Sequence, residues 1–84
     1  MPDKILRILE VRRSLYNFNE TVIIIEALAE GSKAVKYRRT ITLKQAFTEY
    51  DPIELRQKLN EYHDKLALSL RLTQNLLKSL ELRP

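Results

Sequence analysis

Cysteine is absent from this chain of 84 residues. Disulfide bonds and thiolate metal sites are therefore excluded. A chain of this length forms one domain at most, and it buries only about 60–65% of the surface that its unfolded form exposes. Small domains usually need reinforcement, and without disulfides the remaining sources are oligomerisation or a partner. The lack of cysteine also fits the reducing cytosol, so we expect a cytoplasmic protein.

Glycine, histidine and long apolar runs are also scarce. With Gly31 as its only glycine, the chain has no glycine-rich loop to hold a phosphate. The only histidine, His63, has no usual metal ligand three or four residues away on either side, which argues against a zinc site. No apolar run approaches the ~20 residues of a membrane span, and no signal-peptide pattern opens the chain. We therefore expect no catalytic residues, no cofactor, no metal and no membrane contact.

The charge is basic but evenly spread. The chain carries 15 basic and 11 acidic residues, which give a net charge of +4 and an isoelectric point of about 9.6. A mild excess of positive charge lies between residues 33 and 44. A dedicated nucleic-acid-binding domain usually has a denser patch, so charge alone indicates no more than weak attraction to polyanions.

Two strand-like runs flank Gly31. The runs 21–29 and 34–43 are rich in β-branched residues, and a short connection containing glycine joins them. This pattern predicts a β-hairpin. Three consecutive isoleucines at 23–25 place apolar side chains on both faces of the first run, which is typical of a central strand covered on both sides.

The segment 4–12 fits either a strand or a helix. As a strand it would complete a three-stranded meander, with 14–20 as a turn in which Asn17 and Asn19 bond to the nearby backbone. Helical spacing also fits, with Asp3 as the cap. For the strand, strict alternation predicts two sides: Ile5, Leu9 and Val11 on one, Leu6 and Ile8 on the other.

The second half of the chain carries helix signals. Thr42 is a candidate cap for a short helical turn. Asp51 as N-cap, Pro52 at the first helical position and Glu54 at N3 predict the start of a second helix, with Glu54 reaching back to the cap. Nothing breaks a helix from there to Leu82. About 30 residues span roughly 45 Å, against a domain diameter of roughly 30 Å, so the helix overhangs its domain or is broken.

Two apolar stripes run along the predicted helix. The first extends over its full length and is expected to cover the sheet: Leu55, Leu59, Tyr62, Leu66, Leu70, Thr73, Leu77 and Leu80. The second begins only in the C-terminal half and is expected roughly opposite the first: Leu68, Leu72 and Leu76. Because a small sheet covers one side only, the second stripe predicts a homo-oligomer or a protein partner. The alternation of leucines at 66–72 leaves an extra strand there as the alternative.

The strand 35–43 has a basic side that contains Lys36 and Arg38. Such a side can block edge-to-edge aggregation, contact nucleic acid or bind an acidic protein. Tyr37 falls on the opposite, apolar side, which separates an aromatic ring from the positive charge and favours the protective role. The candidate polyanion contacts are Arg12, Arg13, Lys33, Lys36 and Arg38.

These patterns predict a single α+β domain over 1–84. Its sheet region spans 4–43, as a three-stranded antiparallel meander or as an N-terminal helix plus a hairpin, and a long helix follows over 51–82. The function expected is that of a non-catalytic interaction module (an adaptor, accessory subunit or regulator) that forms a homodimer or docks a partner through its leucine-rich helix. The alternative is a small basic protein that binds nucleic acid through the Lys36/Arg38 strand face.

Overall fold

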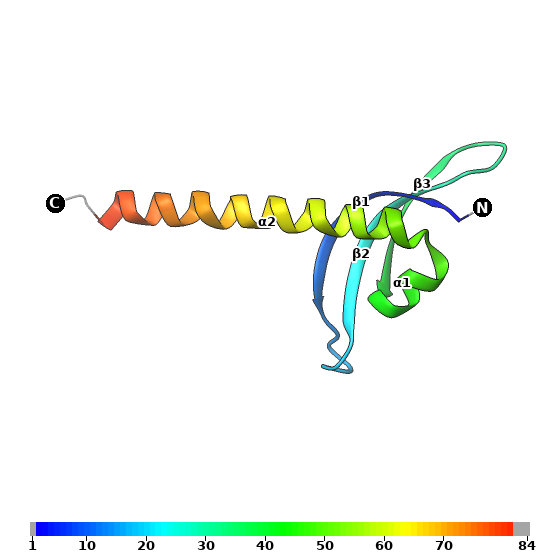
Figure 1. Cartoon of the computed structure of the whole chain (residues 1–84), viewed down its shortest axis with the longest axis horizontal. Helices are drawn as coiled ribbons and strands as arrows, with labels where there is room; N and C mark the ends of the chain where they lie inside the picture. The colour runs from blue at the N-terminus through cyan, green and yellow to red at the C-terminus, as the bar shows by residue number, and fades with distance from the viewer. Residues whose placement is uncertain (1, 82–84) are drawn as a thin grey trace.

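The computed structural model describes residues 2–81 and shows an α+β fold (Figure 1). Three antiparallel strands lie in the order β1–β2–β3, and two helices follow. Segment 4–12 is therefore a strand of a meander, and the helical alternative for it is wrong. The predicted helix end at Leu82 lies outside the described residues. The elements are β1 (Lys4–Arg13), β2 (Thr21–Ala29), β3 (Val35–Thr42), α1 (Leu43–Glu49) and α2 (Pro52–Glu81).

Strand β1 does not alternate regularly. Its pairing with β2 shifts between Ile5 and Arg7 and again between Ile8 and Glu10, so Leu6 and Leu9 are the extra residues of two bulges. The bulges turn every third residue inward: Ile5 and Ile8 are buried, and Val11 packs against the core. The predicted grouping, with Ile5 and Ile8 on opposite sides, is therefore wrong. A spacing of three also explains why the segment fits a helical pattern.

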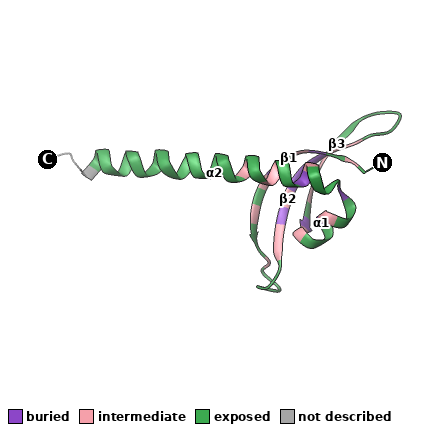
Figure 2. Ribbon diagram, viewed as in Figure 1, coloured by how far each residue is buried: buried purple, intermediate pink, exposed green. Residues whose placement is uncertain are grey.

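The helices cover one face of the sheet, and the core lies between the two layers. α2 crosses over β1, while α1 packs against β2 and β3. Figure 2 shows the buried residues where the helices meet the sheet. The predicted cover on both sides of β2 is wrong, because both helices of the described chain lie on the same face, and Ile24 on the other face is half-buried. The buried apolar residues are Ile5, Ile8, Ile23, Ile25, Ala27, Ile41, Ala46, Tyr50 and Leu55.

Both helix starts have the caps that the sequence predicts, with one difference. The Thr42 hydroxyl accepts a hydrogen bond from the Gln45 N–H, and Asp51 Oδ1 accepts one from the Ile53 N–H at 3.0 Å. Glu54, however, does not reach back to the cap. Its Oε1 accepts a hydrogen bond of 2.8 Å from the backbone N–H of Ile5, at the edge of the sheet. Glu54 therefore fastens α2 to β1.

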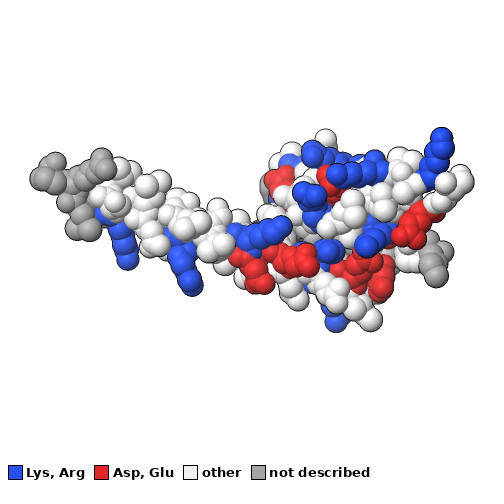
Figure 3. Space-filling view, turned by 90° about the horizontal axis from the view of Figure 1, so that it is seen from above, with Lys and Arg blue, Asp and Glu red and all other residues white. Residues whose placement is uncertain are grey.

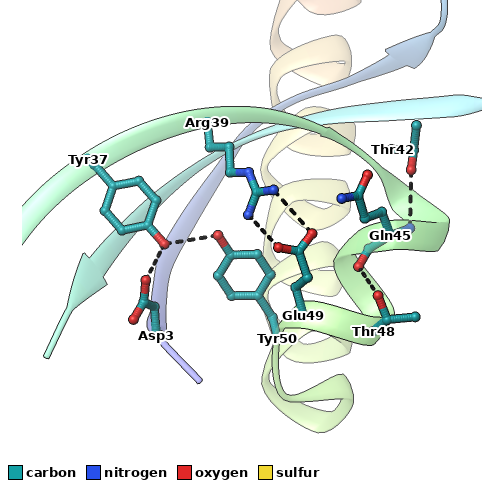
Figure 4. Close-up of polar contacts among 8 residues, drawn as sticks. All are labelled: Asp3, Tyr37, Arg39, Thr42, Gln45, Thr48, Glu49 and Tyr50. Atoms are coloured by element: carbon teal, nitrogen blue, oxygen red, sulfur yellow. Dashed lines mark hydrogen bonds and ion pairs between the residues drawn. The ribbon is translucent and has the colours of Figure 1, made fainter. Parts of the chain in front are cut away.

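A polar cluster closes the end of the core beside α1 (Figure 4). The Tyr37 hydroxyl lies 2.6 Å from Asp3 Oδ2 and 3.0 Å from the Tyr50 hydroxyl. Next to it, Arg39 donates two hydrogen bonds to the Glu49 carboxylate, at 3.0 and 3.1 Å. Burial and the hydrogen bonds to Asp3 and Tyr50 raise the pKa of Tyr37, so its hydroxyl stays protonated at physiological pH. These contacts tie β3 to α1 and to the N-terminal segment.

Helix α2 continues far beyond the sheet it covers. The chain extends over 61 Å along its longest axis against 32 and 20 Å along the others, and Figure 1 shows α2 projecting from the globular part. The predicted overhang is confirmed, and the extra strand at 66–72 is wrong because that segment is helical. In the described chain, no helix is long and apolar enough to cross a membrane.

Candidate functional site

The first candidate surface is the projecting half of α2, which we define as residues 66–81. Every residue from His63 to Leu80 is exposed, as Figure 2 shows. The first stripe therefore covers the sheet only through Leu55, Leu59 and Tyr62, and the expectation that it does so along its full length is wrong. Seven leucines of this half are 45–62% exposed. They are Leu66, Leu68, Leu70, Leu72, Leu76, Leu77 and Leu80.

These leucines form one broad apolar surface. At about 100° per residue, the stripe of Leu68, Leu72 and Leu76 lies roughly 120° from the first stripe, so the expectation that it lies opposite the first is wrong. Together the two stripes occupy an arc of about 200°, about twice what an amphipathic helix on one core needs. Burial of a leucine removes about 100 Å² of apolar surface, so seven half-exposed leucines leave roughly 400 Å² in water. Apolar patches of that size are often functional.

The first stripe has the spacing of a helix-pairing seam. From Leu66 to Leu80 its members follow one another at intervals of four and three residues, with Thr73 in the middle. This is the heptad pattern that brings two helices together side by side. The Thr73 hydroxyl donates a hydrogen bond of 3.0 Å to the Ser69 carbonyl. The one polar group of the seam is therefore satisfied within its own helix.

A groove extends the first stripe onto the globular part. It encloses about 400 Å³ where α2 leaves β1. Its lining residues are Val11, Leu59, Asn60, Tyr62, His63 and Leu66. His63 is exposed and faces this groove rather than a metal site. No group of three or more potential metal ligands occurs among the described residues.

The second candidate surface is the sheet face opposite the helices, which we call the uncovered face. The strand register places two rows of mainly basic residues on it, one from β1 and one from β3, with β2 between them. In Figure 3, Lys and Arg gather on the upper side of the globular part and acidic residues mostly on the lower side. The charged members of the uncovered face are Lys4, Arg7, Glu10, Arg12, Glu26, Lys36 and Arg38.

Glu26 lies at the centre of the uncovered face. Its side chain is only 7% exposed and forms ion pairs with Arg7 at 3.2 Å, Lys36 at 3.3 Å and Arg38 at 3.5 Å. Burial alone would raise the pKa of Glu26, but the close ion pair with Lys36 and the positive charges of Arg7 and Arg38 outweigh it and lower the pKa. One carboxylate therefore holds three cations together, and the cluster keeps an excess of positive charge.

The structure groups only part of the predicted polyanion contacts. Arg12, Lys36 and Arg38 share the uncovered face, whereas Arg13 follows Arg12 and alternates to the other side. Lys33 lies in the connection between β2 and β3. Sequence reasoning missed Arg7, because strict alternation would place it beside Ile5 on the apolar side. The spacing of three in β1 was the signal that could have found it.

An exposed loop borders the uncovered face. Within residues 14–20, the Ser14 hydroxyl accepts hydrogen bonds from the N–H groups of Tyr16 and Asn17, and Asn17 Oδ1 accepts one from the Asn19 N–H. The predicted role of Asn17 in local bonding is thus confirmed. The loop displays three large apolar side chains in water: Leu15 and Phe18 are 73% exposed, and Tyr16 is 100% exposed.

The chain matches no protein-family model, no curated protein and no solved structure.

Proposed function

We propose that the protein is a non-catalytic association module that joins copies of itself through the projecting half of α2. The observation that supports this proposal most strongly is the exposure of all seven leucines in that half. Helical stability in proteins comes mainly from packing of an apolar face. A second chain would supply the packing that the sheet cannot reach. An adaptor, accessory subunit or regulator acting in the cytoplasm would use such a module to fix the spacing of attached partners.

We expect the first stripe to pair with its copy in an antiparallel orientation. The only charged residues between Leu66 and Leu80 are Arg71 and Lys78, both basic. Both lie about 120–140° around the helix from the first stripe, so their charges are compatible with either orientation. Antiparallel helices align their dipoles favourably. In this orientation, Leu80 of the second copy would lie level with Leu66 and enter the groove there.

The second stripe then supplies a further contact. A pair of helices buries one stripe, and the stripe of Leu68, Leu72 and Leu76 lies too far around the helix to join the same seam. Two pairs that pack through this second stripe would form a four-helix bundle, an arrangement in which each helix has two neighbours. The interface predicted from the sequence would thus become the second of two contacts, because the first stripe is also free to pair.

Cross-linking tests the pairing directly, because the chain has no other cysteine. Thr73 is the midpoint of the first stripe, so full overlap brings it beside its copy in either orientation. We expect Thr73→Cys to form a disulfide-linked dimer on mild oxidation. Arg71→Cys, two residues away along the helix but on its polar side, is the matched control and should cross-link poorly. Equal and slow cross-linking of both variants would contradict the proposed seam.

A further inference from the structure

The uncovered face and the loop 14–20 form one continuous surface. A hollow of about 130 Å³ joins them, and its lining combines loop residues with residues of the face. Arg12, Val22 and Thr40 contribute from the face, and Leu15 and Tyr16 from the loop. The fully exposed Tyr16 ring therefore adjoins the basic rows. The expected separation of aromatic and basic groups holds for Tyr37 but not for Tyr16.

Charge and shape of this surface suit a linear polyanion. Its five basic and two acidic residues leave a net charge of +3. Six register positions separate the level of Lys36, opposite Leu28, from that of Arg12, opposite Val22. At about 3.3 Å per residue this is roughly 20 Å, the length of about six stacked nucleotides at 3.4 Å each. A row of cations that ends in exposed aromatic rings provides both contacts that single strands need.

We propose that this surface binds single-stranded nucleic acid. The phosphates lie along the basic residues of β1 and β3, and a base stacks on Tyr16 at the loop. The hydrogen bonds of Ser14 and Asn17 hold the loop in shape before the ligand arrives, which lowers the entropic cost of binding. The site is separate from the projecting half of α2, so it does not depend on self-association.

A membrane surface is the competing ligand for basic and aromatic residues. A bilayer would meet the loop, but Lys36 and Arg38 would then lie up to roughly 20 Å away, beyond the Debye length of about 8 Å at physiological salt. These two cations would contribute nothing to binding. A strand of nucleic acid lying along the face uses all of the cations at once.

The proposal is tested by fluorescence anisotropy of labelled dT12 with the full chain. We expect binding that weakens about 50-fold between 50 and 200 mM salt, the dependence for about four phosphate contacts with a single strand. Tyr16→Ala should weaken binding about tenfold, and Tyr16→Phe should preserve it because the ring remains. Tyr16 is fully exposed, so neither variant should change the thermal unfolding temperature.

Two charge variants test the basic rows. Glu26→Gln removes the central carboxylate and frees its three cations, so it should tighten dT12 binding about fivefold. Arg12→Gln should weaken binding, whereas Arg71→Gln, with the same change in net charge on the projecting helix, should not. Circular dichroism verifies that each variant is folded.

Three results would overturn the proposal. One is no binding of dT12 at 50 mM salt by the folded wild-type chain. Another is unchanged affinity in both Tyr16→Ala and folded Glu26→Gln. The third is equal or tighter binding of another anion, tested with polyglutamate and with vesicles of phosphatidylserine and phosphatidylcholine. Vesicle binding that requires Tyr16 in the absence of dT12 binding would assign the loop to membranes. None of these results bears on the cross-linking of Thr73→Cys.

Discussion

The substitution Leu72→Asp isolates the role of the projecting helix. Leu72 is 60% exposed in the single chain, so the change removes no core contact and costs only the difference in helix propensity, about 0.5 kcal/mol. In the assembly, each lost leucine removes about 1–2 kcal/mol of burial, and a carboxylate brought into an apolar interface costs several kcal/mol more.

For one contact that includes Leu72 from two chains, the lost burial alone is about 2–4 kcal/mol. This corresponds to a roughly 30- to 1,000-fold weaker association. Sedimentation velocity over a concentration series measures the change. Arg71→Gln makes the same change in net charge on the polar side of the same helical turn, and it should leave the association unchanged. If Leu72→Asp sediments with the wild-type mass at every concentration, the second stripe is not an interface.

Three further predictions concern the contacts that hold the globular part together. Glu54→Ala leaves the Ile5 N–H without its acceptor and should lower the free energy of unfolding by about 1–3 kcal/mol. Glu54→Gln keeps an acceptor oxygen and should retain most of that free energy. Chemical denaturation measures both variants. Tyr37→Phe should lower the free energy of unfolding by about 1–2 kcal/mol near pH 7. Because the pKa of Tyr37 is raised on folding, the difference between wild type and Tyr37→Phe should shrink as the pH rises above about 10. The hydrogen bonds from Arg39 lower the pKa of Glu49 on folding, so the stability that Glu49 adds is full above pH 4.5 and is lost as the pH falls through the lower folded-state value. The unfolding temperatures of wild type and Glu49→Gln should therefore converge on acidification, and a constant difference from pH 7 to pH 2 would contradict this assignment.

Local signals in the sequence predicted much of the fold. The hairpin around Gly31, the caps Thr42 and Asp51 and the unbroken run of helix formers are short-range patterns, and all three are present in the structure. The bulges in β1 were not predicted, because they depend on which residues β2 draws to the core. Glu54 has the spacing of a capping box, yet its carboxylate bonds to an amide 49 residues away along the chain. No local pattern indicates such a contact.

The candidate surfaces were predicted only in part for the same reason. Helical spacing alone identified Leu68, Leu72 and Leu76. The position along α2 at which the sheet stops covering the helix, however, depends on tertiary packing, which helical spacing does not reveal. The leucines of the first stripe beyond Tyr62 were therefore assigned to the core. On the sheet, Arg7 joins Lys36 and Arg38 around Glu26 only because two bulges shift the alternation of β1.

The solution mass of the full chain tests the proposed self-association most directly. Sedimentation equilibrium at low and at high salt should give a mass of two or more chains of 9.9 kDa in both conditions, because an apolar interface tolerates salt or is strengthened by it. A folded single chain at both salt concentrations would contradict self-association through the projecting half of α2.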